Sequence, residues 1–524
     1  MEKENHFDAI VIGSGMGALT TASILARLKN KKVLVLEKHF KLGGFTHTFK
    51  REGKFLWDVG IHYVGDMGKQ SMLRKLFDIV TEGKVDWNPM PDLFERFVYP
   101  EITFDQYSSE EKFRSDLIQK FPHEKQAIEN YFSDVKSFSN WATKQFTLKA
   151  KPMLLDTESN NFKLTGAKSP MITTKEYLDA NFKDPVLKAV LVSQWGDYGL
   201  PPSTSAFYMH AGLVVHYLNG GFYPVGGAGT IAESVKPIIE KKGGAMHIFS
   251  EVTEIIMDGE KAIGVKVKQT KGKNILEKEY FAPIIISDAG VYNTYTKLIP
   301  QNVEIPFRES ISNFVTGASS VTLYLGFKEN PAKLGFKGEN YWIYNSIDHD
   351  KNFNEKDNLL KGEPTAFYAS FPSLKDPKAE SFTGEVISFV NYEPFAKWKN
   401  GEWKNRGTDY KELKDRIADG MLNFMERHFP GYKDLVEYKE LSTPLTNEYF
   451  TDHKAGTIYG IPCTLERYTK EWMGVKTPIE NVFITGADAC SPGISGALMG
   501  GFAAATVVLG YNSMMGIMKD SAKI

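Results

Sequence analysis

Cysteine is scarce in this chain, and neither sign of charge is in excess. The 524 residues include 2 cysteines, Cys463 and Cys490. They are too few for a disulfide framework or a cysteine metal site, and they favour a reducing compartment such as the cytoplasm. The formal net charge of −1 argues against a broad basic surface, so no nucleic-acid partner is expected.

Patterns typical of hydrolases and metal enzymes are also missing. The sequence has no His-Glu-x-x-His segment and no Ser/His/Asp order, so no metal site and no hydrolytic centre are predicted. The charged opening segment MEKENHFDA leads directly into a strand, and no secretory signal is expected. One uncharged run, Ile494 to Met518, has the length of a membrane-spanning helix. Its glycines and alanines favour the alternative, a buried closing helix.

The chain does have length and apolar side chains. Hydrophobic residues make up 42% and aromatic residues 13% of the sequence. A chain of 524 residues is too long for one simple core, which predicts two domains or one domain with large insertions.

The first forty residues predict a nucleotide-binding unit. A buried strand at Asp8–Ile12 runs into Gly13-x-Gly15-x-x-Ala18 and then into a helix. The first glycine permits a tight turn, the second lets the backbone approach a pyrophosphate, and the small third residue lets helix and strand pack closely. A second strand, KKVLVLE, ends in Glu37, whose carboxylate is placed to accept hydrogen bonds from ribose hydroxyls.

A second glycine pair, Gly43-Gly44, follows six residues after Glu37. It resembles the extended motif of FAD-binding oxidoreductases and favours FAD over NAD. No later strand carries a second Gly-x-Gly-x-x-Gly turn, so no separate nicotinamide domain is predicted. The external electron donor, NAD(P)H or a redox protein, is left unidentified and is expected to bind transiently.

The rest of the chain contains both strand patterns and helix patterns. A hairpin is predicted at Asp258-Gly259, aromatic strands of an antiparallel sheet at 318–392, and an amphipathic helix at 409–429. A polar stretch at 154–170 reads as a surface loop. A strand is predicted at 482–485, followed by Asp488 and a glycine-rich helix start. This repeats the strand–glycine turn–helix pattern of the N-terminus.

Several blocks together carry a family resemblance. They are WDVGIHYVG, WGDYGLPPSTSAFYMHA, HYLNGGFYPVGG, IIISDAGVYNTY and NVFITGADACSPGISGALMGG. With the glycine motif they resemble the retinol saturases, within the phytoene desaturase and carotenoid isomerase group, over about residues 7–510. The resemblance implies an α/β protein with a Rossmann-like FAD-binding domain of the amine-oxidase type and an inserted α+β substrate domain with a mixed or antiparallel sheet. The expected FAD-binding domain is discontinuous (1–72, 221–300 and 475–524), and the substrate domain comprises 73–220 and 301–474.

The resemblance also implies the cofactor site and the substrate class. The expected FAD-binding residues are Gly13, Gly15, Gly17, Ala18, Glu37, Lys38, Gly43, Gly44, Thr46, Gly60, Val252, Gly486, Asp488 and Ile494. The substrate would be an apolar polyene or lipid, reached through transient contact with a membrane surface. Val225 and Asp288 depart from the residues expected in animal saturases, which weakens the transfer of retinol itself as substrate.

Within WDVGIHYVGD, the expected path of the chain takes Gly60 to the flavin ring and His62-Tyr63 to its reacting face. A saturase needs a proton donor within hydrogen-bond reach of the substrate. His62, Tyr63 and Tyr223 are the candidate catalytic residues, and the whole 207–223 block is expected to line the substrate cavity.

Three functions remain open on the sequence alone. The first is a flavin-dependent polyene reductase. The second is a redox-neutral carotenoid isomerase, or a desaturase, on the same fold. The third is a non-catalytic protein that binds flavin and lipid.

Overall fold

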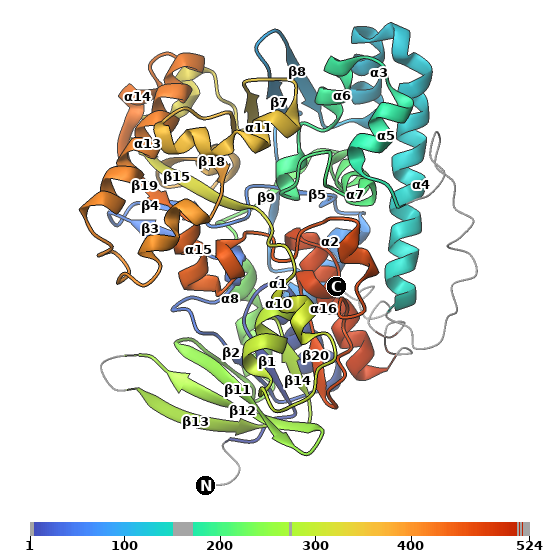
Figure 1. The fold of residues 1–524 in the computed structure, drawn as a ribbon, viewed down its shortest axis with the longest axis vertical. Helices are drawn as coiled ribbons and strands as arrows, with labels where there is room; N and C mark the ends of the chain where they lie inside the picture. The colour runs from blue at the N-terminus through green and yellow to red at the C-terminus, as the bar shows by residue number, and fades with distance from the viewer. Residues whose placement is uncertain (1–4, 150–170, 272–274, 511–512, 514–515, 517–524) are drawn as a thin grey trace.

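The structure is a computed structural model that describes residues 5–149, 171–271, 275–510, 513 and 516. Figure 1 shows its plan. A small antiparallel sheet lies at the bottom of the view, with a parallel sheet and its helices above it. The upper half is divided between a large sheet on the left and a group of helices on the right.

The nucleotide-binding half is built on a five-stranded parallel sheet. In spatial order its strands are β10 (Ala245–His247), β2 (Val33–Leu36), β1 (Ala9–Ile12), β14 (Ile285–Ser287) and β20 (Val482–Ile484). Helices α1 (Met16–Lys29), α8 (Gly229–Glu240) and α16 (Gly493–Leu509) share an apolar cluster with one face of the sheet. Both faces are covered, which explains why β1 and β2 read as continuous apolar runs.

A three-stranded antiparallel sheet covers the other face. It consists of β11 (Ser250–Asp258), β12 (Lys261–Gln269) and β13 (Leu276–Phe281). Ile255 and Val265 of this sheet pack with Ile10 and Leu34 of the parallel sheet. The predicted hairpin is confirmed, with Gly259 at φ +62° in its turn.

A seven-stranded mixed sheet forms the upper left of Figure 1. Its order is β19 (Val436–Ser442), β15 (Ser319–Phe327), β18 (Phe382–Val390), β17 (Ala366–Ser370), β16 (Asn340–Tyr344), β7 (Leu93–Val98) and β8 (Thr103–Tyr107). Only β16 and β7 run parallel to each other. Helix α13 (Thr408–His428) packs on one face through Ile417 and Met421, as its amphipathic pattern predicts. Alternate residues of β15 face opposite ways, so Leu323 joins this core while Thr322 and Tyr324 line a cavity on the other side.

The remaining helices and strands lie around these sheets. The helices are α2 (Met72–Thr81), α3 (Glu110–Lys120), α4 (Lys125–Lys149), α5 (Thr174–Asn181), α6 (Pro185–Leu191) and α7 (Phe207–Tyr217). The shorter helices are α9 (Gly290–Asn293), α10 (Arg308–Ser312), α11 (His349–Asn354), α12 (Pro372–Lys375), α14 (Tyr432–Leu435) and α15 (Pro444–Thr451). The strands are the hairpin β3 (Thr48–Arg51) and β4 (Phe55–Asp58), and the small sheet of β5 (Val64–Gly65), β9 (Gly221–Pro224) and β6 (Trp87–Pro89).

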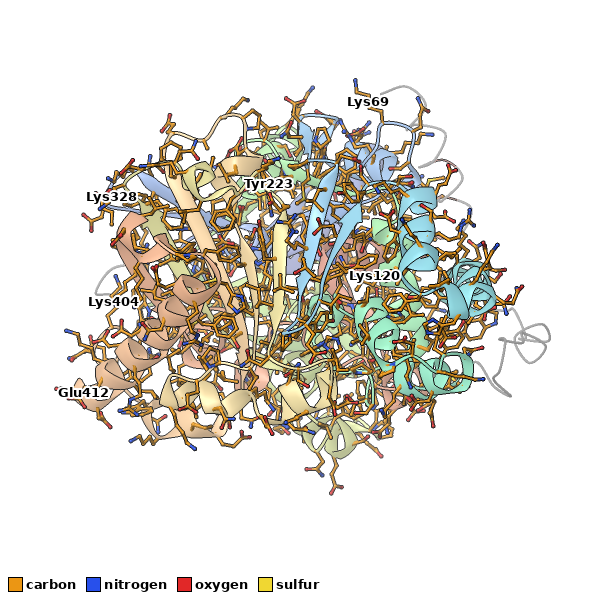
Figure 2. The ribbon with its side chains drawn as sticks, turned by 90° about the horizontal axis from the view of Figure 1, so that it is seen from above. Lys69, Lys120, Tyr223, Lys328, Lys404 and Glu412 are labelled. Atoms are coloured by element: carbon orange, nitrogen blue, oxygen red, sulfur yellow. The ribbon has the colours of Figure 1, made fainter. Side chains whose placement is uncertain are left out.

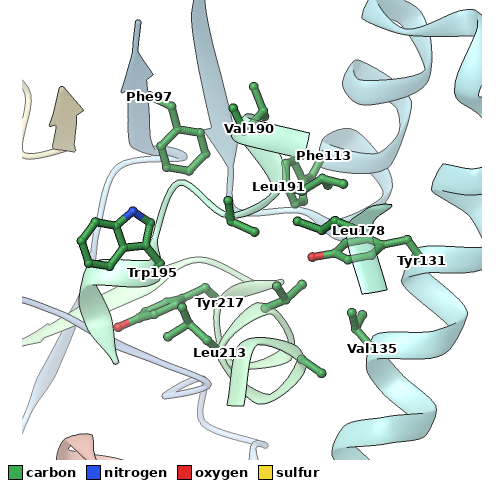
Figure 3. Packing of buried hydrophobic residues seen from close by; sticks show 14 of the residues in the cluster. Phe97, Phe113, Tyr131, Val135, Leu178, Val190, Leu191, Trp195, Leu213 and Tyr217 are labelled. Carbon is green, nitrogen blue, oxygen red and sulfur yellow. The ribbon is translucent and has the colours of Figure 1, made fainter. Parts of the chain in front are cut away.

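A large aromatic core holds the helical group to the mixed sheet. Figure 3 shows Trp195, Tyr217 and Leu213 on one side of this core and Tyr131 of α4 on the other. Tyr177 stacks on Phe207 with ring centroids 3.7 Å apart. The high aromatic content of the sequence is therefore used in part for packing.

The fold confirms the predicted class, a Rossmann-like α/β unit joined to a region with a mixed sheet. The domain boundaries remain a prediction, and the loop predicted at 154–170 lies outside the described residues. Across the described part of the chain, no helix has the length and apolar character needed to span a bilayer. Helix α16, at the start of the uncharged run, packs against α1.

Candidate active site

One cavity of about 1130 Å³ joins the nucleotide-binding half to the mixed sheet. At one end its wall is formed by the glycine loop after β1 and by Glu37 at the end of β2. At the other end the wall is formed by aromatic side chains of the mixed sheet and by Trp195. The β4–β5 segment with Gly60 and His62 contributes to the same wall. The cavity therefore brings the two halves of the predicted site into one space.

The glycine loop forms the nucleotide end. Gly13 has φ +92°, which favours glycine, and Gly15 begins α1 as its N-cap. A Cβ on Gly17 would overlap the backbone of Gly486, so this glycine serves close packing between α1 and the loop after β20. Ala18 is fully buried beneath the loop. A helix start of this kind suits a pyrophosphate, and here the Asp288 carboxyl group accepts from the backbone of Gly15 and Ala18.

Asp288, at the end of β14, lies against this loop. A Cβ on Gly15 would come within 2.5 Å of its Oδ2. Burial, with a smaller contribution from the neighbouring Glu37 and Asp488 carboxylates, raises the pKa of Asp288 to about 7. The expectation that Asp288 and Val225 bear on the substrate was wrong. Asp288 belongs to the nucleotide end, and Val225 is absent from the cavity wall.

Glu37 is held for ribose recognition. Ser14 Oγ donates to its Oε2 at 2.6 Å, and the backbone N–H of His39 donates to Oε1 at 2.8 Å. Burial raises its pKa, and these hydrogen bonds oppose the rise. The neighbouring Lys38 pairs with Asp452 at 2.9 Å across the cavity mouth.

The second glycine pair closes over the first. Gly43 and Gly44 have φ +117° and +56°. A Cβ on Gly44 would come within 2.9 Å of Gly15 Cα, so the two glycine loops nearly touch. The N–H of Gly43 donates to Ser14 Oγ at 3.0 Å, and Thr46 Oγ1 donates to the Gly43 carbonyl at 2.6 Å.

Asp488 offers an acceptor to a ligand hydroxyl. Its Oδ2 accepts from the backbone N–H of Val291 at 2.9 Å. Its Oδ1 is buried, lies 3.8 Å from the Arg467 guanidinium and accepts no hydrogen bond from any described residue, and the side chain lines the cavity. Because a buried acceptor without a hydrogen bond is unfavourable, this oxygen fits a bound hydroxyl group. Together with Glu37 and the glycine loops, it fits the hydroxyls and pyrophosphate of a dinucleotide.

Ten of the fourteen predicted cofactor residues line the cavity. They are Gly13, Gly15, Glu37, Lys38, Gly44, Thr46, Gly60, Val252, Asp488 and Ile494. The other four, Gly17, Ala18, Gly43 and Gly486, lie outside its wall and serve backbone geometry and packing. His39 and His47, which flank the second glycine pair, also line it, and burial lowers the pKa of both.

The opposite end of the cavity is an aromatic arm. We use this name for the wall formed by Trp195, Asp197, Trp342, Tyr344, Tyr368, Ile387 and Phe389. The rings of Trp195 and Phe389 stack at 5.1 Å, and those of Trp342 and Tyr368 lie 4.6 Å apart. Such a wall suits a flat apolar ligand.

The three candidate catalytic residues have different positions. His62 lines the cavity, with its Nδ1 2.6 Å from Glu385 Oε2. Tyr63 lies behind the wall, and its hydroxyl donates to Asp197 Oδ2 at 2.6 Å. Tyr223 is buried in the interior (Figure 2), and it donates to Asp58. Of the three, only His62 is placed to contact a ligand directly.

The sequence prediction missed a group of buried ionisable residues in and around the aromatic arm. Burial raises the pKa of Asp58 to about 7, of Glu95 to about 8 and of Asp197 to about 7. Burial lowers the pKa of Lys375 to about 8, and its ammonium donates to the carbonyl of His62 at 2.9 Å. Asp197 lies in the block WGDYGLPP, and an acid inside an aromatic block is the local signal that could have indicated it.

The 207–223 block does not form the cavity wall, contrary to the expectation. His210 bonds Tyr131 at 2.8 Å, and His216 accepts from the N–H of Gly65 at 2.8 Å. Tyr217 stacks on Tyr63 at 4.4 Å. The block instead supports the layer behind the wall.

Comparison with known proteins gives one family model, relatives named as retinol reductases and a relative named as an isomerase. The family of the NAD(P)-binding Rossmann-like domain matches residues 11–80. All-trans-retinol 13,14-reductase of Danio rerio is 37% identical over 96% of this chain and 86% of its own length, and the human protein of that name is 33% identical over 96% and 86%. A Danio rerio protein named inactive all-trans-retinol 13,14-reductase is 30% identical over 97% and 86%. Prolycopene isomerase 1 of an Oncidium hybrid cultivar is 26% identical over 94% and 82%.

Solved structures share the fold. A putrescine oxidase bound to putrescine has a TM-score of 0.62 at 12% identity, covering 96% of this chain and 99% of its own. An oxidoreductase from Methanosarcina mazei has a TM-score of 0.61 at 15% identity, covering 94% and 98%. These likenesses support the amine-oxidase type of architecture predicted from the sequence.

Proposed function

The chain belongs to the all-trans-retinol 13,14-reductase family, and from that premise we propose that it is an FAD-dependent reductase of an apolar polyene. It adds two hydrogens to a C=C bond of a retinoid or carotenoid. The observation that carries the proposal is the single cavity, which joins a dinucleotide cradle to an aromatic arm.

FAD is the dinucleotide that best explains the two glycine pairs. Gly13, Gly15 and the start of α1 would hold the pyrophosphate, Glu37 the adenosine ribose, and Asp488 Oδ1 a ribityl hydroxyl. Gly44, pressed against Gly15, lets the chain pass close to the cofactor. Bound and reduced, the flavin supplies a hydride, which is the electron pair that saturation requires.

The protein's own residues would do the rest. The aromatic arm excludes water and holds the polyene chain flat, because its rings present apolar faces. His62, fixed by Glu385, lies between the two ends of the cavity and would orient the reacting bond. This division of roles follows the general rule that the protein supplies binding and orientation to a cofactor.

Two alternatives use the same cavity. A carotenoid isomerase or desaturase has support from the prolycopene isomerase relative. A non-catalytic protein that binds flavin and lipid has support from the relative named inactive. The cradle and Asp488 support flavin binding, which all three readings share, so turnover has to separate them.

The mass of the product tests the proposal. The flavin of the purified protein is reduced without oxygen, all-trans-retinol or a longer carotenoid is added, and the product is weighed. We expect a gain of two hydrogens. An unchanged mass with a new retention time would indicate isomerisation, and a loss of two hydrogens would indicate desaturation. No change with any polyene would support the non-catalytic alternative.

Partners and location follow from the substrate class. Apolar polyenes partition into lipid, so the protein would contact a membrane surface transiently. The proposed location is the cytoplasm. The electron donor would be NAD(P)H or a redox protein that binds only during reduction. Vesicle co-sedimentation and anaerobic reduction by NAD(P)H measure these two contacts separately.

A further inference from the structure

We propose that Asp197 is the acid that protonates the polyene, and that Tyr63 positions it. This inference rests on the proposed function, because only saturation takes up a proton along with the hydride. Its basis is the place of Asp197 in the cavity wall and its hydrogen bond to a buried tyrosine.

Asp197 is the one carboxyl group on the aromatic arm, as far as the described residues show. It follows Trp195 and Gly196 in a single 3-10 turn, Trp195–Asp197, which is anchored on both sides. A Cβ on Gly196 would overlap the ring of Trp342, so the turn lies directly against the sheet. The Trp195 indole donates to His349 Nδ1 at 2.9 Å. The carboxyl is therefore held rigidly on an otherwise apolar wall.

Tyr63 controls which oxygen of Asp197 carries the proton. Its hydroxyl donates to Oδ2 at 2.6 Å and accepts from Gln194 Nε2 at 3.2 Å. With Oδ2 occupied, the acid proton of Asp197 belongs on Oδ1. Tyr63 itself is immobilised by stacking on Tyr217 at 4.4 Å. A positioned acid of this kind is what proton transfer to carbon requires.

The surroundings favour the protonated acid. Four buried carboxyls lie in this layer with two bases; they are Asp58, Glu95, Asp197 and Glu385, with His62 and Lys375. Even with both bases charged, full ionisation would leave two uncompensated negative charges away from water, which is strongly unfavourable. The titratable groups that act on Asp197 are His62, Tyr63, Glu95, Lys375, Tyr198, Tyr217, Tyr344, Tyr368 and Tyr459. Burial raises the pKa of Asp197 to about 7, so a substantial fraction of the acid is protonated at neutral pH.

The chemical step balances as follows. A bound, reduced flavin would supply a hydride with its electron pair to one carbon of the C=C bond. The π electrons form a new C–H bond with the proton on Asp197 Oδ1, and the O–H bond of the acid breaks. Asp197 is left as a carboxylate that still accepts from Tyr63, and water restores its proton after the product leaves. His62 Nδ1 faces Glu385, which gives this histidine an orienting role.

Three variants and a control test the assignment. Asp197→Asn keeps the shape and removes the proton, and we expect saturation to fall by about 10²- to 10⁴-fold. Asp197→Glu should recover part of the rate. Tyr63→Phe retains the acid but frees Oδ2, so its pH–rate profile should shift while bound flavin stays constant. Asp258→Asn, exposed at the end of β11 and outside the cavity wall, is the control and should match the wild type.

A readout independent of turnover is the infrared band of a protonated carboxyl. The wild type should show this C=O band near pH 6 and lose it as the pH rises through about 7, and Asp197→Asn should lack one such component. Full saturation by Asp197→Asn, or no difference in the band, would overturn the proposal. A rate lost only in His62→Gln would assign the proton to His62 instead. If the wild type saturates no polyene, the proposed function itself fails. If the wild type and Asp197→Asn saturate the polyene equally well, only the role of Asp197 fails.

Discussion

Replacing Gly17 with alanine tests whether the crossing of α1 and the β20 loop holds the nucleotide cradle together. A Cβ at this position would overlap the backbone N and Cα of Gly486. The obstacle is backbone, so no side-chain rotation relieves it, and overpacking of this kind destabilises by about 1–3 kcal/mol. The better helix propensity of alanine offsets less than about 1 kcal/mol. We therefore expect Gly17→Ala to lower the free energy of unfolding by roughly 1–2 kcal/mol.

Gly212 provides a matched control, because it also lies inside a helix, α7, and a Cβ there meets no atom within 4 Å. Gly212→Ala should stabilise by about 0.5–1 kcal/mol, the opposite sign. The assay is urea unfolding followed by tryptophan fluorescence, with the flavin content of each purified variant measured by absorbance. Gly17→Ala should also retain less flavin, because the start of α1 is displaced. Equal stability and full flavin content in Gly17→Ala would refute the packing argument.

Three further predictions concern the buried carboxyls. Glu37→Ala removes a charged ribose acceptor worth about 1.5–3 kcal/mol, so FAD affinity measured by fluorescence titration should fall about 10- to 100-fold; an unchanged affinity would place the ribose elsewhere. Asp58→Ala leaves the N–H of Ala228 and the hydroxyl of Tyr223 unpaired. It should lower the free energy of unfolding, measured in urea, by about 2–4 kcal/mol, and a loss below ~1 kcal/mol would contradict the burial argument. The folded-state pKa values of Asp58 and Asp197 are raised to about 7 from 3.8, so the folded protein binds more protons than the unfolded chain. Stability should therefore be greatest near the lower value and fall as the pH rises through about 7, by up to about 1.4 kcal/mol per unit for each group, and Asp197→Asn should flatten this slope.

The nucleotide end could be predicted because its signals are local in sequence. Gly13, Gly15 and Glu37 stand at fixed distances along one strand–turn–helix–strand unit, and the structure brings all three to the cavity. Gly17 and Gly486 were predicted to bind the cofactor, and the structure places them against each other beside the cavity. Whether Gly17 faces a ligand or Gly486 depends on a contact between residues 469 positions apart, which no local pattern encodes.

The substrate end was predicted less well because its residues meet only through tertiary packing. Tyr223 and the 207–223 block looked suitable by composition, but α7 turns its side chains into the supporting layer. Asp197 approaches Tyr63 across 134 positions, and Lys375 approaches the carbonyl of His62 across 313. A single sequence does not reveal such pairs. An acid inside an aromatic block such as WGDYGLPP is the local pattern that could have predicted a functional carboxyl group.

The position of Asp197 bears on the choice among saturation, isomerisation and desaturation. The dinucleotide cradle does not discriminate among them, since each reaction uses the same flavin. Their proton balance does discriminate: saturation takes up one proton with each hydride, isomerisation takes up none, and desaturation releases one. Burial raises the pKa of Asp197 to about 7, so a fraction of this acid is protonated at neutral pH, and placing such a carboxyl on an apolar wall is unfavourable for folding. An isomerase gains nothing from it, so Asp197→Asn should leave an isomerase fully active, whereas a saturase should lose its rate. The same substitution therefore separates the two chemistries on one protein.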